Sequence, residues 1–475
     1  MFYPKTVAVV GAKAAGNYGW LRRNQVFEGK LYSVQIDEAE IPGIEEMGIP
    51  NYKSIGDIPE PVDYVIFAVP RKATPAVFRD CIEARVGGVS LYSAGFAETD
   101  TEGVHLQETL SKMSIDSGVP LIGPNSMGVY NPGIGLRQGN DQPHGEKGVV
   151  GFLGQSGTHS SYYSTTLDRL YGIKLGLGVS FGNAAVLDAA DWVEYIGGKP
   201  EIRVLTAYIE GIGDDRQRFV DAVSRVASEK PVLLWKGGRT EDGSRASSNH
   251  TSSREVPVEE WDALVREAGA IRADDLETIV DTTAALQNLP RLQGPRGALI
   301  CMTGGQSVVI TDAFNDAGLR VPTLTEKSYA ALHEFYDVIG GSYRNPLDVG
   351  WMSNTPDVVQ RELAILDADE NTDFVTMEMF APNMPLKRAV GARSHLRLED
   401  SGSETREGLN FLDVLANQQQ KGTKPFFVMV TATHAEREAV DLRDALKEHG
   451  VLAFPSPKRA ANAYRRALDY WDRRR

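Results

Sequence analysis

The chain repeats one pattern of apolar and polar positions three times. A short apolar run is followed by a Gly-rich turn and then by a segment with helical periodicity. The three runs begin at Thr6, Gly148 and Gly297. Near-continuous apolar strands that alternate with helices are typical of parallel sheets covered on both faces. The pattern therefore predicts an α/β protein with three doubly wound parallel sheets.

Polar segments rich in Gly, Pro and Gln separate the three repeats. They lie at 133–147 and 289–296, and this composition marks connections rather than core elements. The segments predict three domains, at 1–140, 146–290 and 296–475. A charged stretch at 388–407 has few apolar residues, so we expect a solvated insertion or mobile loop in the third domain.

Composition narrows the class of protein. The chain has 475 residues, of which 42% are hydrophobic and 24% charged, as in ordinary globular proteins. Its net charge of −14 disfavours non-specific nucleic-acid binding. We expect no membrane span, because no apolar run approaches roughly 20 residues, and no signal peptide, because Met1-Phe-Tyr-Pro leads directly into the first expected strand. The only cysteines, Cys81 and Cys301, argue for a reducing cytoplasm and against a disulfide framework or a metal site.

One histidine lies in an unusually long polar segment. His250 falls between an apolar run at 231–236, expected to be a strand, and an amphipathic segment at 258–269, expected to be a helix. An ordinary strand-to-helix connection has about 2–6 residues, so the whole intervening segment is predicted to be a loop. Imidazole is nucleophilic at neutral pH, which makes His250 a candidate carrier of a phosphoryl group. The alternative is an incidental histidine on a surface loop.

The first Gly-rich turn favours a nucleotide other than a nicotinamide. The turn that begins at Gly11 lacks the G-x-G-x-x-G spacing, and the second strand ends at Gln35 instead of an acidic residue. Backbone N–H groups at a helix N-terminus still bind phosphate well. Loops at 93–96 and 122–128 follow apolar strands, which places them at the same edge of the sheet.

Short motifs are spread over nearly the whole chain. They read Val10-Gly-Ala, Gly29-Lys-Leu-Tyr-Ser-Val, Ser93-Ala-Gly-Phe, Gly123-Pro-Asn-Ser-Met-Gly, Gly154-Gln-Ser-Gly, Val179-Ser-Phe-Gly-Asn, Tyr208-Ile-Glu-Gly, Gly238-Arg-Thr, Asn249-His-Thr, Thr303-Gly-Gly and Asn345-Pro-Leu-Asp. Taken in this order, the chain resembles the α subunits of ADP-forming acetate–CoA ligases. These are NDP-forming acyl-CoA synthetases, related to the succinyl-CoA synthetase α subunit.

The resemblance implies a domain plan and a reaction. A Rossmann-like CoA-binding domain should precede two flavodoxin-like domains, the first of which carries the phosphohistidine. Carboxylic acid, CoA and ATP would give acyl-CoA, ADP and phosphate through an acyl phosphate and a phosphohistidine at His250. The family's ATP-grasp module has no counterpart in the chain. We therefore expect a separate β subunit that binds most of the ATP or ADP with Mg²⁺, in a cytoplasmic α2β2 or larger complex.

The implied CoA site follows the edge of the first sheet. Lys13 is expected to neutralise a phosphate, while Pro70 and Phe96 are expected to wall the pantetheine. The full set expected to bind CoA is Gly11, Lys13, Gly16, Gln35, Val69, Pro70, Ser93, Gly95, Phe96, Asn125 and Ser126.

The implied phosphohistidine site combines groups from the second and third domains. Glu210, at the end of its strand, is expected to orient the His250 ring and to stabilise its cationic form. Two helix N-termini would supply backbone N–H groups and favourable dipoles to the phosphoryl group. They lie at Gln155, Ser156 and Gly157 and at Gly304, Gly305 and Gln306. His159 is the alternative nucleophile, and tight corners are the alternative role of the turns.

The chain departs from the family's pattern in one loop and at two single positions. The family's Ser-His-Thr-Gly-Ser-Leu-Ala-Gly reads Asn-His-Thr-Ser-Ser-Arg-Glu-Val from Asn249, Ser126 replaces a cysteine, and Gln35 replaces an asparagine. These changes leave the acyl substrate open. Two other classes of protein stay open. The altered loop after His250 favours a catalytically silent CoA-binding or regulatory homologue, whereas the first-turn spacing and Gln35 argue against a nicotinamide-dependent oxidoreductase.

Overall fold

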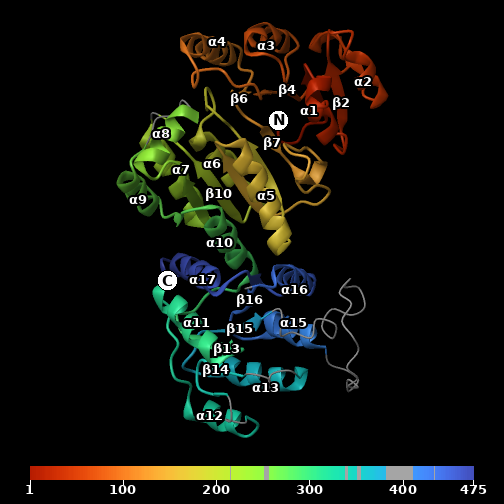
Figure 1. Cartoon of the computed structure of the whole chain (residues 1–475). Helices are drawn as coiled ribbons and strands as arrows, with labels where there is room; N and C mark the ends of the chain where they lie inside the picture. Colours follow the sequence, from red (N-terminus) through yellow and green to blue (C-terminus); the bar gives the residue numbers. More distant parts are fainter. Residues whose placement is uncertain are drawn as a thin grey trace. The chain divides into compact units, whose positions relative to one another are not determined.

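The computed structural model describes residues 1–213, 215–250, 256–336, 341–349, 355–380, 410–432 and 434–474. It divides into two compact units, each of which is described by itself. The first unit comprises Met1–Arg169 and Ile173–Ile279, and the second comprises Leu170–Gly172 and Val280–Arg475. Three mostly parallel sheets flanked by helices confirm the predicted α/β class (Figure 1).

The first sheet has the strand order β3-β2-β1-β4-β5-β6, and its strands are parallel. This is the order of a doubly wound dinucleotide-binding sheet, which changes direction between β1 and β4. The strands are β1 (Thr6–Val10), β2 (Lys30–Val34), β3 (Asn51–Tyr52), β4 (Tyr64–Phe67), β5 (Val89–Leu91) and β6 (Leu121–Ile122). The helices are η1 (Ala14–Gly16), α1 (Gly19–Arg23), α2 (Ile41–Glu46), η2 (Ile55–Asp57), η3 (Arg71–Ala73), α3 (Thr74–Glu83) and α4 (Thr101–Ser117).

The second sheet has the order β12-β11-β10-β8-β9-β7, in which only β7 is antiparallel to its neighbour. Without β7 this is the flavodoxin-like order, which changes direction between β8 and β10. The strands are β7 (Gly128–Tyr130), β8 (Val150–Gly154), β9 (Leu175–Ser180), β10 (Val204–Ile209), β11 (Val232–Lys236) and β12 (Ile271–Ala273). The helices are η4 (Pro132–Ile134), α5 (Gly157–Tyr171), α6 (Ala189–Gly197), α7 (Arg216–Glu229), α8 (Glu241–His250), α9 (Val258–Glu267) and α10 (Leu276–Asn288).

The two sheets of the first unit share one buried apolar cluster. It includes Ile66 from the first sheet and Leu153 and Val179 from the second. A buried hydroxyl also joins them, because Tyr64 Oη accepts the N–H of Val129 at 3.1 Å. Strand β7, which belongs to the second sheet, lies within the predicted domain 1–140; the three predicted domain ranges stay a prediction.

The third sheet, in the second unit, has the parallel order β14-β13-β15-β16-β17. This order is also flavodoxin-like, and it changes direction between β13 and β15. The strands are β13 (Gly297–Cys301), β14 (Leu347–Asp348), β15 (Phe374–Phe380), β16 (Phe426–Thr431) and β17 (Ala453–Phe454). The helices are α11 (Gly304–Asp316), α12 (Glu326–His333), α13 (Pro356–Asp367), α15 (Phe411–Lys421), α16 (Glu436–Glu448) and α17 (Pro457–Asp472). The charged stretch 388–407 lies outside the described residues.

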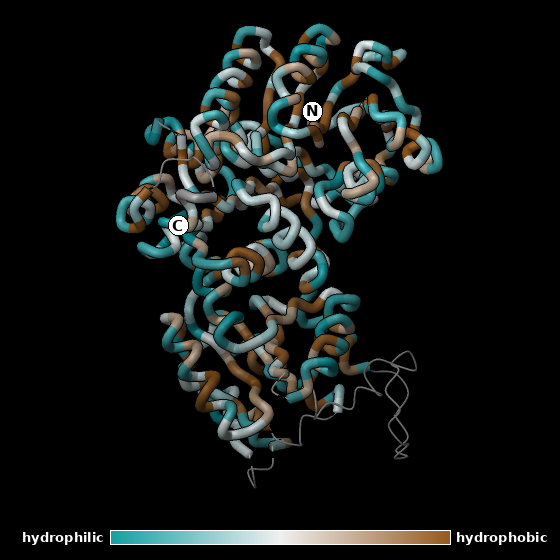
Figure 2. Tube along the Cα trace, turned by 45° about the horizontal axis from the view of Figure 1, so that its top comes forward, coloured by the Kyte–Doolittle hydropathy of each residue, from teal (hydrophilic) through white to brown (hydrophobic). Residues whose placement is uncertain are grey.

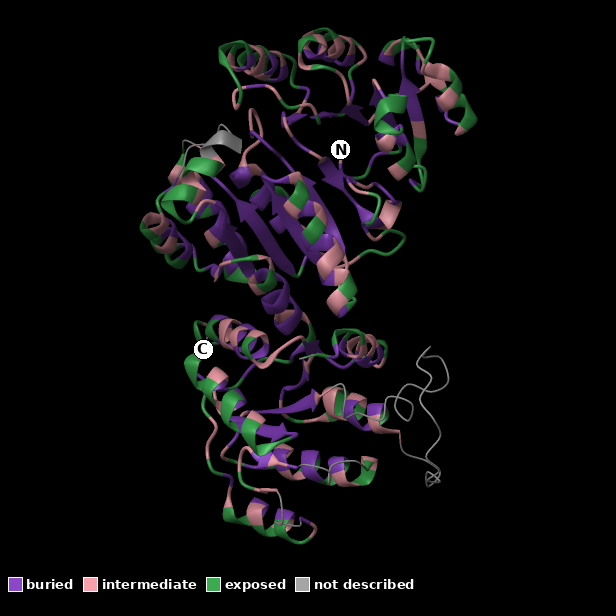
Figure 3. Cartoon of the chain, in the orientation of Figure 1, coloured by how far each residue is buried: buried purple, intermediate pink, exposed green. Residues whose placement is uncertain are grey.

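Hydropathy and burial follow the layers of each unit. The strands are mostly hydrophobic and buried, whereas the helices turn hydrophilic, exposed residues outward (Figures 2 and 3). Every residue of β1, β8, β10 and β13 is buried, as expected for strands covered on both faces. Within the described residues, no helix is long and apolar enough to cross a membrane.

The prediction of one long loop before the 258–269 helix is wrong, because α8 (Glu241–His250) occupies ten residues of it. Two acidic residues, Glu241 and Asp242, lie in the first turn, where they complement the helix dipole. Thr240 Oγ1 accepts the N–H of Gly243 at 3.1 Å, as a helix cap does. The Gly and Ser content of the segment obscured this start signal. The His250 side chain and residues 251–255 lie outside the described part of the structure.

Candidate functional site

The first Gly-rich turn lies where the first sheet changes direction. Gly11 follows β1 with a φ of +82°, and a Cβ there would lie 2.5 Å from Val69 Cγ1, beyond β4. Only glycine fits such a position. By contrast, a Cβ on Gly16 would meet nothing within 4 Å. Lys13, between the two glycines, is exposed, as a phosphate-binding ammonium must be.

Gln35 braces this turn from the neighbouring strand. Its side-chain Nε2 donates to Ala12 O at 2.8 Å, and its Oε1 accepts the N–H groups of Ile36 at 2.9 Å and Asp37 at 3.0 Å. The residue is only 5% exposed. These bonds engage its amide with the backbone, so its predicted contact with CoA stays a prediction.

The chain's own carboxylates fill two backbone N–H sites at this edge of the sheet. The Ala14 N–H, at the start of η1, donates to Glu40 Oε2 at 2.7 Å. The N–H groups of Gly95 and Phe96 donate to the two oxygens of Glu98, at 2.6 and 3.1 Å. These N–H groups are therefore already engaged within the chain, whereas the Lys13 ammonium of the first turn is exposed.

The loops after β4 and β5 differ in exposure. Pro70 is exposed and Val69 is half-buried, and the Ser93 hydroxyl donates to Val69 O. Phe96 is fully buried in the apolar cluster that contains Phe67. Its ring therefore belongs to the core, and the expected contact with pantetheine would require the loop to move.

The loop after β6 is held against the end of β5. Asn125 adopts a left-handed conformation with a φ of +55°, and its N–H donates to Ser93 O at 3.0 Å. Ser126, which replaces the family's cysteine, is 3% exposed and its hydroxyl donates to Leu91 O at 3.2 Å. The structure thus places the loops that contain the predicted CoA-binding residues, from the loop of Gly11 to that of Ser126, along one edge of the first sheet.

The second Gly-rich turn lies where the second sheet changes direction. Gln155, directly after β8, is 1% exposed, and its Oε1 accepts the N–H groups of Glu210 at 2.5 Å and Gly211 at 2.9 Å. Its Nε2 has no hydrogen-bond partner among the described residues. Ser156 is also buried, and Gly157 begins α5, whose dipole favours an anion at this end. The structure thus brings the turn and the predicted glutamate together.

Glu210 directly follows β10 and is 4% exposed. The hydroxyl of Tyr208 forms a hydrogen bond with it, and burial together with this carboxylate raises the pKa of Tyr208. Lys236 is 2% exposed and donates to Glu210 O at 2.9 Å and Gly237 O at 2.8 Å. Lys236 was not predicted from the sequence to be part of this site. Its position at the end of a buried strand could have indicated it.

The segment that leads to His250 passes over Glu210. The N–H of Gly237 donates to Ile209 O at 2.8 Å. A Cβ on Gly237 would lie 3.0 Å from Glu210 Cγ, so this position is tightly packed on the glutamate. Gly238 then turns the chain with a φ of +68°, just before α8 begins. The contact between Gly237 and Glu210 thus lies four residues before the start of the helix that ends at His250.

His159, the alternative nucleophile, packs in an aromatic cluster. The centroid of its ring lies 4.4 Å from that of Tyr208 and 4.6 Å from that of Trp235. The two other rings lie 4.6 Å apart. This packing on two rings favours a structural role for the histidine.

The third Gly-rich turn, in the second unit, lies where the third sheet changes direction. Thr303 caps α11, because its Oγ1 accepts the N–H of Gln306 at 3.3 Å. The Gln306 side-chain Nε2 donates to Oε1 of Glu378 at 3.2 Å, and the Met302 N–H donates to Oε2 at 3.3 Å. Glu378, in β15, is fully buried, and this burial raises its pKa. The sequence reading missed Glu378, although a lone acid in an apolar strand is a readable signal.

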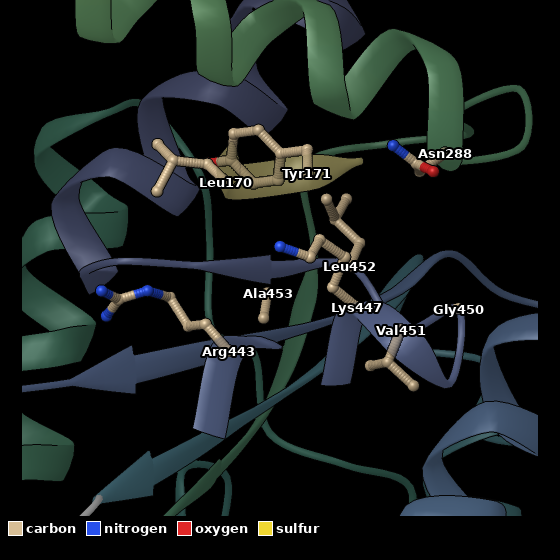
Figure 4. Close-up of a pocket in the computed structure, with 9 residues that line it drawn as sticks. All are labelled: Leu170, Tyr171, Asn288, Arg443, Lys447, Gly450, Val451, Leu452 and Ala453. Atoms are coloured by element: carbon tan, nitrogen blue, oxygen red, sulfur yellow. The ribbon is translucent and has the colours of Figure 1, made fainter. Parts of the chain in front are cut away.

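Among the described residues of the second unit are a larger and a smaller cavity. The larger, of about 420 Å³, adjoins the third Gly-rich turn. It is lined by Gly304, Ser307, Val308, Thr311, Asp312, Ser342, Arg344, Asn345, Pro346 and Asp348. The smaller, of about 50 Å³, lies between Tyr171, Arg443 and Lys447 and is too small for CoA or a nucleotide (Figure 4). The described residues contain no cluster of His, Cys, Asp or Glu suited to a metal ion.

Two family models match the first unit and the start of the second. A model described as a CoA binding domain matches residues 5–132. A model described as a succinyl-CoA ligase like flavodoxin domain matches residues 147–286. The matches correspond to the two sheets that hold the first and second Gly-rich turns.

The relatives decide the family. The chain is 31% identical over 484 residues to the Acetate–CoA ligase [ADP-forming] I subunit alpha of Pyrococcus furiosus, covering 100% of this chain and 97% of that subunit. This chain belongs to the family of ADP-forming acetate–CoA ligase α subunits. The resemblance inferred from the motifs is thereby confirmed.

Two further comparisons agree with this family. The chain is 33% identical over 380 residues to the Acetate–CoA ligase [ADP-forming] I of Archaeoglobus fulgidus, and it spans about half of that protein, 54%. A structure of the dinucleotide forming acetyl-coenzyme A synthetase 1 of Ca. Korarchaeum cryptofilum, in complex with phosphate and ADP, matches with a TM-score of 0.80. Its identity is 26%, and the match covers 99% of this chain and 96% of that one.

Proposed function

We propose that this chain is the α subunit of an NDP-forming acyl-CoA ligase that converts a carboxylic acid, CoA and ATP to acyl-CoA, ADP and phosphate. One observation supports the proposal most. Buried Glu210 and the Gly-rich turn at Gln155 share the point where the second sheet changes direction, and Gly237, in the segment leading to His250, packs on Glu210. Open α/β sheets bind their ligands at this kind of point.

The proposed chemistry runs through His250. The imidazole attacks the γ-phosphorus of ATP, and ADP leaves. A carboxylate oxygen of the acid then takes the phosphoryl group from the imidazole and becomes an acyl phosphate. The CoA thiolate attacks the acyl carbon, and inorganic phosphate leaves.

Each group of the second sheet has a part in these steps. The Glu210 carboxylate orients the imidazole and stabilises its cationic form. The turn at Ser156 and Gly157, at the N-terminus of α5, stabilises the phosphoryl group with backbone N–H groups and the helix dipole. In the third sheet, Gly304 and Gly305 at the start of α11 offer the same chemistry.

The first sheet is proposed to bind CoA. Its strand order and the tight Gly11 turn suit a phosphate-bearing nucleotide, and exposed Lys13 supplies a positive charge. Val69, Pro70, Ser93 and the Asn125 loop would line the remainder of the ligand along the same edge. The fit is physical: glycine permits close approach, and the lysine compensates charge.

The acid is proposed to bind in the larger cavity of the second unit. Its volume of about 420 Å³ admits a small organic acid, and it adjoins the turn at Gly304. Exposed Arg344 at its rim supplies a guanidinium, which pairs well with a carboxylate.

The nucleotide is proposed to be bound by a partner. We infer a separate ATP-grasp β subunit that holds most of the ATP or ADP with Mg²⁺, in an α2β2 or larger assembly. The similarity to an α subunit over its near-entire length supports this arrangement. The chain alone should then show no acid-dependent ATP turnover.

Reconstitution tests the function. The chain is mixed with an ATP-grasp β subunit, ATP, Mg²⁺, CoA and a panel of carboxylic acids, and thioester and ADP are quantified. We expect both products in equal amounts with at least one acid. CoA binding without turnover would favour the catalytically silent homologue, and binding of NAD at least tenfold tighter than CoA would favour the oxidoreductase.

A further inference from the structure

Glu98 joins the CoA-side edge of the first sheet to the second sheet. Its two carboxylate oxygens accept the N–H groups of Gly95 and Phe96, at 2.6 and 3.1 Å. The second oxygen also accepts Nδ2 of Asn183, at 2.6 Å. One carboxylate therefore holds two backbone N–H groups of its own loop and one side chain from the loop after β9.

The orientation of the Asn183 amide is fixed by its neighbours. Besides Glu98, its Nδ2 donates to Oε1 of Gln107 at 3.0 Å. The ionised Glu98 carboxylate only accepts hydrogen bonds, so a flipped Asn183 amide would lose its bond to Glu98. The residue is 5% exposed, and its Oδ1 has no partner among the described residues. The Asn183 side chain therefore takes part in these contacts through its NH₂ group, as a hydrogen-bond donor.

The backbone around Asn183 connects two candidate ligand loops. Its N–H donates to Pro124 O at 3.0 Å, beside the loop of Asn125. A Cβ on Gly182 would lie 2.2 Å from Pro124 O, so the two loops pack without space for a side chain. On the other side, the Phe181 N–H donates to Gly154 O at 2.9 Å, at the start of the second Gly-rich turn.

We infer that Glu98 is a positioning residue, which sets the CoA edge of the first sheet against the phosphate turn of the second. A hydrogen bond to a carboxylate is roughly twice as strong as one between neutral groups. Three such bonds, from Gly95, Phe96 and Asn183, converge on this side chain. The consequence for CoA rests on the proposed function, whereas the consequence for the loop does not.

Loop order is the direct measurement. In Glu98→Ala, the N–H groups of Gly95 and Phe96 lose their acceptor, so hydrogen exchange of the 93–97 segment should become at least tenfold faster. Glu98→Gln retains one acceptor, so its exchange rate in this segment should lie between those of Glu98→Ala and the wild type. Glu108→Gln is the matched control, because Glu108 is exposed on α4 and its carboxylate lies 3.5 Å from Nδ1 of His105. Unchanged exchange in Glu98→Ala would overturn the inference.

Binding and chemistry should separate in the same variants. Glu98→Ala should raise the calorimetric Kd for CoA at least tenfold, while phosphoenzyme formed with ATP and the β subunit stays within about twofold of the wild type. A general loss of folding would instead weaken CoA binding and reduce phosphoenzyme formation together. If the wild-type chain binds no CoA, the proposed function fails and the exchange result still judges Glu98. If the wild type binds CoA and Glu98→Ala binds it equally well, the positioning role is wrong.

A charge exchange tests the pair itself. Asn183→Asp places a second carboxylate against Glu98 and should weaken CoA binding about as much as Glu98→Ala. Adding Glu98→Gln to Asn183→Asp restores one amide and one carboxylate, and should recover at least a third of the lost affinity on a logarithmic scale. Additive losses in the double variant would show that the two side chains act independently and would contradict the inference. Should Glu98→Ala not fold, this exchange and Glu98→Gln still decide the question.

Discussion

The Gln155 side chain and the Glu210 backbone meet where the second sheet changes direction, with Gln155 Oε1 accepting the Glu210 N–H at 2.5 Å. The third sheet has a related pair, because Gln306 donates to Glu378 at 3.2 Å. In both sheets a glutamine of the Gly-rich turn is bonded to a glutamate at or beyond the next strand. The contact is to the backbone N–H of Glu210 in the second sheet and to the carboxylate of Glu378 in the third, so the two flavodoxin-like sheets each hold a buried glutamate near a Gly-rich turn through different atoms.

The bond between Gln155 and the strand end should contribute to stability. Gln155→Met keeps the size of the side chain but leaves the N–H groups of Glu210 and Gly211 buried without this acceptor. The free energy of unfolding should fall by about 1–3 kcal/mol. Urea unfolding measures the change, and Gln217→Met on the exposed face of α7 is the control. A loss below about 0.5 kcal/mol, the ordinary scatter of surface substitutions, would contradict the assigned role.

The Gly11 turn should not accept a side chain. Gly11→Ala combines a positive φ with a contact of 2.5 Å to Val69 Cγ1, so the turn must shift. We expect a loss of roughly 1–3 kcal/mol in stability and a Kd for CoA raised at least tenfold. Gly56→Ala, where the nearest atom is 3.8 Å away, is the matched control. Calorimetry that shows wild-type CoA affinity in Gly11→Ala would remove this turn from the site.

The buried carboxyl of Glu378 should make stability depend on pH. Burial raises its pKa in the folded chain, so its contribution is fully present below the unfolded pKa of about 4.3. It is then lost as the pH rises through the folded pKa. Glu378→Gln has no such titration. The unfolding midpoint of the wild type, relative to that of Glu378→Gln, should therefore decrease as the pH is raised from 4 to 8.

Glu448→Gln, at an exposed end of α16, is the control for this titration. Its midpoint relative to the wild type should stay constant over the same series. A wild-type midpoint that rises with pH relative to Glu378→Gln would have the wrong sign for a raised pKa.

Arg344 should affect the acid and not CoA. Arg344→Gln removes the guanidinium from the rim of the larger cavity. With the β subunit, the KM for the acid should rise about tenfold or more, while the KM for CoA should stay within twofold. Arg320→Gln, outside the lining of that cavity, serves as the comparison. Equal effects on both substrates would argue against an acid site there.

The sequence predicted the layers well, because apolar runs such as Thr6–Val10 and Val150–Gly154 become strands buried on both faces. The family resemblance also implied that Glu210 and Gln155 belong to one site, and in the structure both follow strands that are neighbours in the second sheet. Helix α8 was missed because serine and glycine obscured its acidic first turn. Lys236 and Glu378 were missed because burial of a lone charge depends on tertiary packing, which local patterns do not contain. Phe96 looked like a ligand contact by its position in a loop, but its ring lies in the core.

Glu210 should increase the rate at which His250 accepts the phosphoryl group without accepting that group itself. Glu210→Gln removes the negative charge beside the turn but keeps a side chain of the same size. The phosphoenzyme should form more slowly, by roughly tenfold to a thousandfold, because the imidazole loses an anionic partner and keeps its attacking nitrogen. Rapid-quench kinetics with the β subunit measures this rate. A rate equal to that of the wild type would show that Glu210 does not act on the histidine.

A phosphorylation assay shows most directly whether His250 carries the phosphoryl group. Wild type, His250→Ala and His159→Ala are incubated with radiolabelled ATP, Mg²⁺ and the β subunit, and acid-labile, base-stable phosphate is counted. We expect label on the wild type and on His159→Ala, and the next two outcomes follow from the same role of His250. We expect no label and no acyl-CoA with His250→Ala, whose CoA affinity stays close to that of the wild type. Acid-labile phosphate that persists in His250→Ala would contradict this role.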